Sequence, residues 1–291
     1  MKTHRLETYL LSLSCAALLP LLAAAPACSF NSSHLSQVMT VRNCTACDLS
    51  EADLRGLSLA SAVLASSNLE AANLGRTDLN AANLSGVDLS GATLEGANLG
   101  MANLQGARLV MANLRGVNLA GANLSGTTLN FADLSGADLR GARLVGVHLG
   151  GVTMRGARLV RCDLSKFDVS NSDLSKADLS EVSLRGTNLR NVILVGAELI
   201  ETDFSGADLA GANLASTNLT RALNLSGLKL AGANLSNANL KKIDLSGSDL
   251  TGANLTGANL SGTKLSGARL GGATWKDGHT CAEASLGECS K

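Results

Sequence analysis

Residues 81–140 read AANLSGVDLSGATLEGANLGMANLQGARLVMANLRGVNLAGANLSGTTLNFADLSGADLR. Leucine occupies every fifth position, a small residue usually stands two positions before it, and Asn or Asp usually stands one position before it. A period of five would turn the leucine by about 140° per step on an α-helix, and odd steps on a straight strand alternate between faces. Leucines at this spacing share one interior only if the backbone turns a corner once per repeat and successive coils stack.

Two of the repeats, residues 82–86 (Ala-Asn-Leu-Ser-Gly) and 137–141 (Ala-Asp-Leu-Arg-Gly), show the shared motif Ala-Asn/Asp-Leu-x-x. This motif resembles that of the pentapeptide-repeat family. The resemblance implies an all-β fold, a right-handed quadrilateral β-helix with four repeats per coil. The spacing runs unbroken over residues 49–219 and resumes over residues 225–275, so the resemblance covers most of the 291-residue chain.

The composition of the chain favours a narrow solenoid over an ordinary globular core. Aromatic residues make up 2% of the chain, whereas globular cores rely on Phe, Tyr and Trp for much of their buried area. The formal net charge is 0, without the basic excess that phosphate binding requires. The sequence therefore predicts no nucleic-acid partner.

Residues 1–27 are predicted to be an export signal. Lys2 and Arg5 precede an apolar run over residues 9–25 that ends in small residues suited to cleavage. A transmembrane anchor is the alternative, but this run is shorter than the roughly 20 apolar residues that span a bilayer. Cleavage would leave Cys28 first, as a candidate for lipidation, although Ala25 stands where lipoprotein signals carry Leu. We expect a periplasmic or secreted protein with no transmembrane span after signal removal.

Residues 28–43 lie outside the repeat and are predicted to cap the first coil. Ser33 is a candidate N-cap for a short helix in which Leu35, Val38 and Met39 share one face. An open solenoid end would expose unpaired strand edges, so a cap is physically required. An irregular linker is the alternative that the sequence leaves open.

The repeat region, residues 44–275, begins with Cys44 and Cys47, both at positions predicted to face the interior. A structural disulfide is the favoured interpretation in an exported protein. A reactive redox pair and a zinc site are the alternatives. Cys162 falls at a small interior position and is predicted to be a buried apolar side chain rather than a nucleophile.

Residues 276–291 are predicted to form a C-terminal loop closed by a disulfide between Cys281 and Cys289. Trp275 occupies the last central position and is large enough to plug the coil, and Asp277-Gly278 indicates a turn. The segment resembles the Trp/Phe-x-Asp-Gly…Cys…Cys ending of exported members of the family. Both ends of the solenoid are thus expected to be capped.

One irregularity interrupts the repeats. The step from Leu219 to Leu225 is six residues, which predicts a bulged corner with Leu223 and Leu228 facing inward in place of the usual small residue. Elsewhere, Asn and Asp before each leucine are turn formers, so their frequency needs no catalytic explanation.

Four repeats per coil would stack residues 20 positions apart at about 4.8 Å. This register places Met111 beside Phe131 on the outer surface, as a candidate interaction patch. It also predicts ladders of opposite charge that neutralise the Arg-rich stretch 140–166. The predicted polar stacks are Arg158 between Asp138 and Asp178, Arg143 beside Asp163, Arg161 beside Glu181, and His148 beside Asp168.

The repeats predict an architecture but no catalytic site. The sequence contains no phosphate-binding loop, serine–histidine–acid arrangement or metal-binding cluster, and its four His are scattered at positions 4, 34, 148 and 279. We therefore expect a non-catalytic exported structural or protein-interaction solenoid that uses no cofactor and binds a protein or cell-envelope partner. The expected caps favour a monomer or a weak dimer.

Two alternatives belong to other functional classes. The resemblance extends to relatives that protect DNA gyrase, which suggests a DNA-mimicking topoisomerase-binding module. Those relatives are strongly acidic and cytoplasmic, whereas this chain is neutral and begins with an export signal. The other alternative is a redox or metal-binding protein that uses Cys44 and Cys47.

Overall fold

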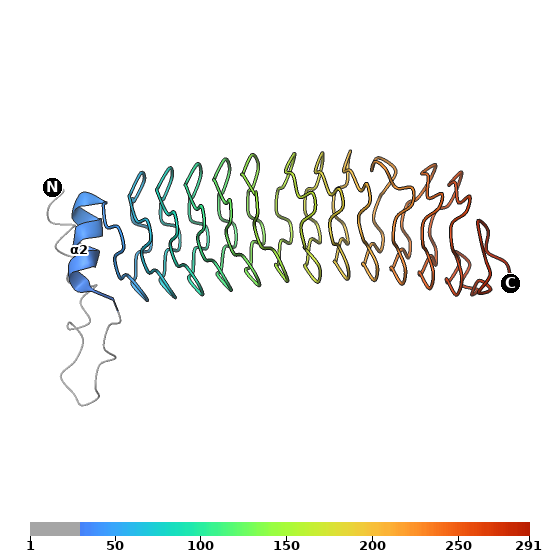
Figure 1. The fold of residues 1–291 in the computed structure, drawn as a ribbon, viewed down its shortest axis with the longest axis horizontal. Coiled ribbons are helices and arrows are strands. Elements are labelled where there is room, and N and C mark those ends of the chain that lie inside the picture. Colours follow the sequence, from blue (N-terminus) through green and yellow to red (C-terminus); the bar gives the residue numbers. More distant parts are fainter. Residues whose placement is uncertain (1–29) are drawn as a thin grey trace, which may run out of the picture.

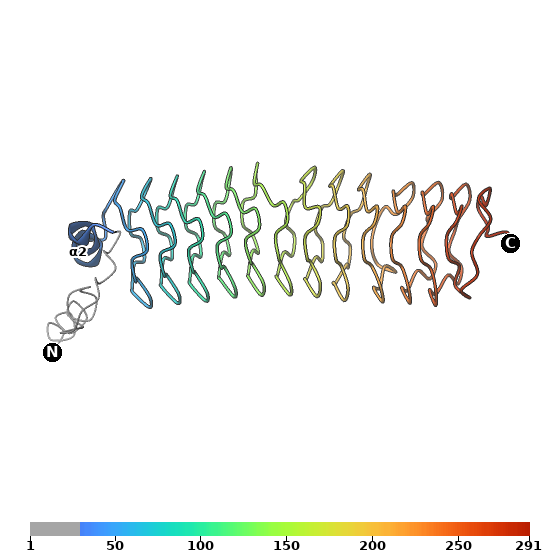
Figure 2. The ribbon, with the colours of Figure 1, turned by 90° about the horizontal axis from the view of Figure 1, so that it is seen from below.

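The computed structural model describes residues 30–291, so the predicted signal segment 1–27 and Cys28 lie outside the described part of the chain. The repeats form a rod of stacked coils, with helix α2 at one end and the C-terminus at the other (Figure 1 and Figure 2). Parallel bridges join residues 20 positions apart, such as Asn83 with Asn103 and Asn103 with Asn123, so each coil contains four repeats. The chain is the right-handed quadrilateral β-helix that the sequence predicts.

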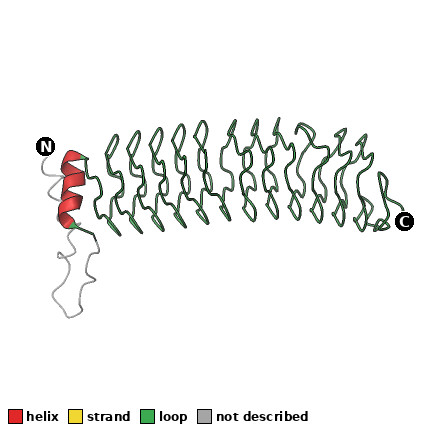
Figure 3. Cartoon of the chain, in the orientation of Figure 1, coloured by secondary structure: helices red, strands yellow, loops and turns green. Residues whose placement is uncertain are grey.

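The sides of the coils pair through single bridges instead of long strands. Leu84 N–H donates to Asn103 O at 2.7 Å, and Asn103 N–H donates to Ala82 O at 2.9 Å. A corner in every repeat ends the pairing after one bridge, and Figure 3 accordingly shows the coils of the described chain in the colour of loops and turns. An interior coil still hydrogen-bonds to both of its neighbours, as a strand does in a parallel sheet.

The corners follow from the residues on either side of the central leucine. Asn83 Oδ1 accepts a hydrogen bond from Ser85 N–H at 3.2 Å, and the next residue, Gly86, has a left-handed φ of 63°. Glycine adopts this conformation without steric cost, and Asn and Asp close such turns with their short side chains. The prediction that Asn and Asp serve as turn formers is confirmed.

Central leucines fill the interior together with the small residues two positions before them. Where the small residue is Thr, its hydroxyl finds a carbonyl on the previous coil, as in the 2.7 Å hydrogen bond from Thr77 Oγ1 to Leu54 O. Such bonds satisfy polar groups that would otherwise be costly to bury. Cys162 is buried and free, as predicted, and its Sγ donates to Leu139 O at 3.3 Å.

Helix α2, Ser32–Val41, covers the first coil. Its N-cap is Asn31 and not Ser33, so the predicted cap residue was wrong by two positions: Asn31 Oδ1 accepts from Ser33 N–H at 3.0 Å. The side chains of Leu35 and Val38 are buried against the coil. Residues 30–291 contain no helix that is long and apolar enough to cross a membrane.

The six-residue step after Leu219 shifts the register by one residue. Bridges on both sides of it join residues 20 apart, whereas those across it join residues 21 apart, for example Asp208 with Lys229. Leu228 faces inward as predicted, but the prediction for Leu223 was wrong because its side chain is 45% exposed. Leu223 takes the outward position of the bridge to Asp203, and Asn224, with φ 57°, absorbs the extra residue.

The ladder is interrupted on two adjacent sides of the coils near residue 150, where Figure 1 shows a wider step. Within residues 30–291, no bridge joins 143 with 163 or 148 with 168. The predicted stacks of Arg143 on Asp163 and His148 on Asp168 are therefore wrong. Phe167, at an interior position that Ala usually fills, packs against the core here. We attribute the break to the volume of this ring, because overfilled interiors force the backbone apart.

The C-terminal segment folds back over the last coil. Antiparallel bridges join Arg269 with Leu286 and Thr274 with Thr280. The side chain of Trp275 is partly buried against the core, and the backbone N–H of Trp275 donates to His279 O at 2.7 Å. The final segment thus covers the end of the interior opposite to helix α2.

Candidate functional site

The most exposed large apolar side chains of the repeats lie at corners. Met111 is 67% exposed and Phe131, one coil further on, is 65% exposed. We call these two residues, with the partly buried Val110, the apolar corner. Met101 is also 74% exposed, but it lies two repeats before Met111 and therefore occupies the opposite corner of the coil.

Glycine at the following coil lets the Phe131 ring lie flat on the backbone. A Cβ atom on Gly151 would approach Cδ1 and Cε1 of Phe131 to 2.7 Å, closer than real side chains allow. The hydrogen bond from Gly151 N–H to Ser170 O lengthens to 3.4 Å beside this contact. Asn130 Oδ1, adjacent in sequence to Phe131, is buried without a partner within the described residues. The apolar corner is thus a ridge with a fixed ring on its surface.

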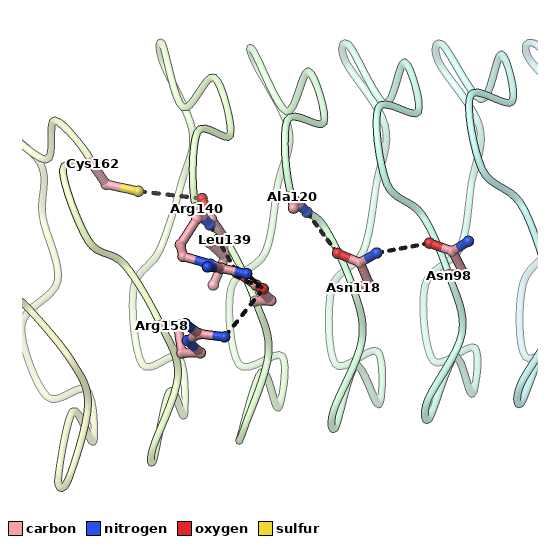
Figure 4. Close-up of polar contacts among 8 residues, drawn as sticks. Asn98, Asn118, Ala120, Leu139, Arg140, Arg158 and Cys162 are labelled. Carbon is pink, nitrogen blue, oxygen red and sulfur yellow. Dashed lines mark hydrogen bonds and ion pairs between the residues drawn. The ribbon is translucent and has the colours of Figure 1, made fainter.

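Polar side chains form two short ladders on one face between two corners (Figure 4). Asn98 Nδ2 donates to Asp78 Oδ1 at 2.9 Å, and Asn118 Nδ2 donates to Asn98 Oδ1 at 2.9 Å. Further along the same face, the Arg140 guanidinium donates to both oxygens of Asp138. These hydrogen bonds lower the pKa of Asp138, outweighing the opposite effect of its burial.

Two of the predicted charge stacks are confirmed. Arg158 Nη1 lies 3.7 Å from Asp138 Oδ2, and the backbone of Arg158 also pairs with that of Asp178. Arg161 donates to both carboxylate oxygens of Glu181, at 2.8 and 3.1 Å. Because an arginine stands beside a carboxylate in each of these two stacks, they form no continuous acidic stripe.

Arg143, by contrast, turns to Ser125. Its Nε donates to Ser125 Oγ at 3.1 Å, across the coil boundary where the ladder is intact. The side chain of Ser165 and its backbone N–H, which donates to Asp163 at 2.9 Å, lower the pKa of Asp163.

The N-terminal cysteines form a disulfide, Cys44 to Cys47, in the first coil. Both are buried, and the hydroxyl of Ser67 ties them down by donating to Cys44 O at 2.7 Å and accepting from Cys47 N–H at 3.1 Å. His34, on α2, accepts from Asp48 N–H through Nδ1 at 3.0 Å. Residues 30–291 contain no group of three or more His, Cys, Asp or Glu side chains placed to hold a metal ion.

The C-terminal cysteines also form a disulfide, Cys281 to Cys289. His279 lies between Asp277, which hydrogen-bonds to Nδ1, and Cys289, whose Sγ is 3.1 Å from Nε2. Sequence inspection missed this arrangement because the loop leaves the repeat, so no periodic spacing places His279 beside Cys289.

One model of a known protein family matches the chain along most of its length. Its description is "Pentapeptide repeats", and the matched residues are 43–80, 72–110, 82–121, 118–156, 157–196, 194–237 and 233–272. The chain belongs to the pentapeptide repeat family. In a comparison with curated proteins, none matches this chain.

Solved structures of the same family are similar to this one. HetL, a pentapeptide repeat protein involved in heterocyst differentiation regulation from the cyanobacterium Nostoc sp. strain PCC 7120, is 31% identical, with 86% of this chain and 99% of HetL covered and a TM-score of 0.37. QnrB1, a plasmid-mediated fluoroquinolone resistance protein, is 16% identical, with 66% and 92% covered and a TM-score of 0.52. The likeness to QnrB1 shows the fold alone.

Proposed function

We propose that this pentapeptide repeat protein is an exported interaction solenoid whose apolar corner binds a protein partner, with repeats that carry no catalysis. The observation that supports this most directly is the exposure of Met111 and Phe131 side by side on a rigid backbone. Aromatic and Met side chains are enriched in protein interfaces, where few residues supply most of the binding energy.

The size of the corner suits an anchor rather than a whole interface. Burying an exposed Phe or Met side chain contributes about 1.5–3 kcal/mol, so Met111 and Phe131 could anchor a contact that flanking polar residues complete. The ring of Phe131 already lies on Gly151, so little rotamer freedom is lost on binding.

Two features support export. The first 27 residues have the composition of a signal segment. Two disulfides close the ends of the rod, and such bonds persist mainly in oxidising compartments. We therefore propose a periplasmic or secreted location with a protein or cell-envelope partner, and Cys28 as a candidate lipid anchor.

The charge pattern disfavours the DNA-mimicking alternative. A mimic of duplex DNA needs rows of unpaired negative charge. Here Asp133, Asp203 and Asp208 each pair with an arginine on a neighbouring coil, and the formal net charge is 0. The fluoroquinolone resistance in the description of QnrB1 is accordingly not extended to this chain.

A crosslinking experiment in the native host tests the proposal. Position 131 receives a photoreactive phenylalanine analogue, and Met101, equally exposed on the opposite corner, receives the same analogue as the matched control. We expect one discrete adduct with a protein from position 131 and none from position 101. Adducts of equal yield from both positions, or none from either, would contradict a partner site at the apolar corner.

A further inference from the structure

The C-terminal loop places an acid–base group on a disulfide sulfur. His279 Nε2 is 3.1 Å from Cys289 Sγ, and Nδ1 is hydrogen-bonded to the Asp277 carboxylate. An ionised carboxylate only accepts, so Nδ1 carries a proton, and in the neutral form of the ring the lone pair of Nε2 faces the sulfur. Asp277, His279 and Cys289 thus form a line of the kind that activates nucleophiles.

The two sulfurs of this bond differ in access. Cys281 is buried, at 2% exposure, whereas Cys289 is only partly buried at the end of the rod. A thiol arriving from solvent can therefore reach Cys289, which is also the sulfur that His279 contacts. Access and activation coincide on one atom.

The other disulfide of the described chain lacks both properties. Cys44 and Cys47 are both buried, and Cys44 Sγ faces the backbone oxygen of His34, not its ring. The Nδ1 atom of His34 instead accepts a hydrogen bond from Asp48 N–H. Cys44–Cys47 therefore serves as an internal control, because it has neither an accessible sulfur nor a histidine ring against a sulfur.

We propose that the Cys281–Cys289 disulfide is a thiol–disulfide exchange site for thiols that approach from solvent, with Cys289 as the reacting sulfur, His279 as its acid–base catalyst and Asp277 as the positioning residue. This inference goes beyond the proposed interaction function and does not depend on it. The site lies outside the repeats, so it leaves the non-catalytic role of the solenoid unchanged.

The exchange proceeds in two balanced steps. A first thiol gives its proton to His279 Nε2, and its sulfur bonds to Cys289; the Cys281–Cys289 bond breaks, and Cys281 leaves with the electron pair and takes a proton from water. A second thiol, deprotonated by solvent, attacks the sulfur of the first; Cys289 leaves with the electron pair and takes the proton from His279. Two thiols are oxidised to a disulfide, and the protein disulfide is reduced to two thiols.

Asp277 supports this cycle by holding the imidazole. Burial alone would raise the pKa of Asp277, but the hydrogen bonds from His279 outweigh it and lower the pKa, so the carboxylate stays ionised. Among the described residues, the charged side chain in hydrogen-bond contact with His279 is that of Asp277, and the other close groups are Cys289 Sγ and the Trp275 backbone. The ionised carboxylate thereby fixes the ring with Nε2 directed at Cys289 Sγ.

The first test compares the two disulfides within the purified full chain. The protein is incubated with reduced glutathione, samples are quenched by alkylation, and mass spectrometry follows each cysteine. We expect Cys281–Cys289 to open at least about 10-fold faster than Cys44–Cys47, with glutathione attached to Cys289 in the intermediate. Equal rates, or glutathione on Cys281, would show that the bond is structural only.

Variants assign the roles. H279Q should slow the opening of Cys281–Cys289 by at least about 10-fold, in line with acid–base contributions of about 10²–10⁴. D277N should slow it less and shift its pH dependence, while H148Q, an exposed histidine on the repeats, serves as the matched control. The rate at Cys44–Cys47 reports folding in the same molecules. An unchanged rate in H279Q would overturn the proposal.

A measurement on the unaltered protein covers the case in which H279Q disturbs the loop. After reduction, the rate of Cys289 alkylation by iodoacetamide is measured from pH 5 to pH 9. A thiolate paired with His279 should react well below pH 7, whereas a free cysteine follows a pKa of about 8.5. A profile of the free-cysteine kind would refute the pairing.

Discussion

Replacing Phe167 by Ala tests whether the ring causes the interrupted ladder. The expected ladder hydrogen bonds of six N–H groups are absent from the structure within residues 30–291, namely those of Gly141, Leu144, Gly146, Leu149, Asp163 and Asp168. If F167A lets the coils close, six backbone bonds return, each worth about 0.5–1.5 kcal/mol. The lost ring costs at most about 3–5 kcal/mol, the value for fully buried Phe→Ala changes, because Phe167 is only partly buried. The returning bonds offset the loss of the ring, so we expect F167A to show little or no fall in the free energy of unfolding.

Phe204 provides the matched control. It is fully buried at a central position, and its own N–H keeps a ladder bond to Leu223 O at 3.2 Å. F204A therefore loses the ring with nothing to regain, and its unfolding free energy should fall by the full cost of about 3–5 kcal/mol. Denaturant unfolding measures both variants, and hydrogen exchange reports the six amides individually. A loss in F167A as large as that in F204A, with the six amides still exchanging fast, would refute the packing explanation.

Three smaller predictions concern the surface and the buried thiol. Burial, aided by the charge of Asp138, raises the pKa of the Cys162 thiol to about 11, so iodoacetamide at pH 8 should label Cys162 only in denaturant; labelling of the native protein would contradict its burial. The lowered pKa of Asp138 means that its pairing with Arg140 stabilises the fold above the unfolded value of 3.8 and that this stabilisation is lost as the pH falls through the lower folded-state pKa. R140Q should therefore destabilise the fold slightly at pH 7 and progressively less as the pH falls below 3.8, measured by denaturant unfolding. N118A removes the bond to Asn98 and the turn bond to Ala120 N–H, and should lower the melting temperature by an amount equivalent to about 1 kcal/mol.

The sequence predicts the fold because one spacing determines it. A leucine at every fifth position requires a coil that turns a corner once per repeat, and the four repeats per coil that the family resemblance implies then specify the neighbours of each residue. The stacks of Arg158 on Asp138 and Arg161 on Glu181 follow from this register alone. Where the 20-residue register is maintained, the sequence alone identifies which side chains stack on each other.

The errors arise where side-chain volume interrupts the pairing or where an inserted residue shifts the register. Arg143 and Asp163 are 20 apart, yet the coils separate beside Phe167, so the two side chains find Ser125 and Ser165 instead. At the bulge, spacing does not show which residue is the extra one. The C-terminal cluster could not be predicted because its loop leaves the repeat, and no periodicity relates His279 to Cys289.

Because the coils stack in a fixed register, the length of the rod can change while its cross-section stays the same. Each coil contacts only the coils beside it, so the gain or loss of 20 consecutive residues would change the rod by one coil, about 4.8 Å, and leave all other contacts in place. The bulge at Asn224 shows that even a single inserted residue is absorbed within one corner, after which bridges again join residues 20 apart. The rod therefore acts as a ruler, whose graduation is one coil and whose two capped ends stay at a separation fixed by the number of repeats.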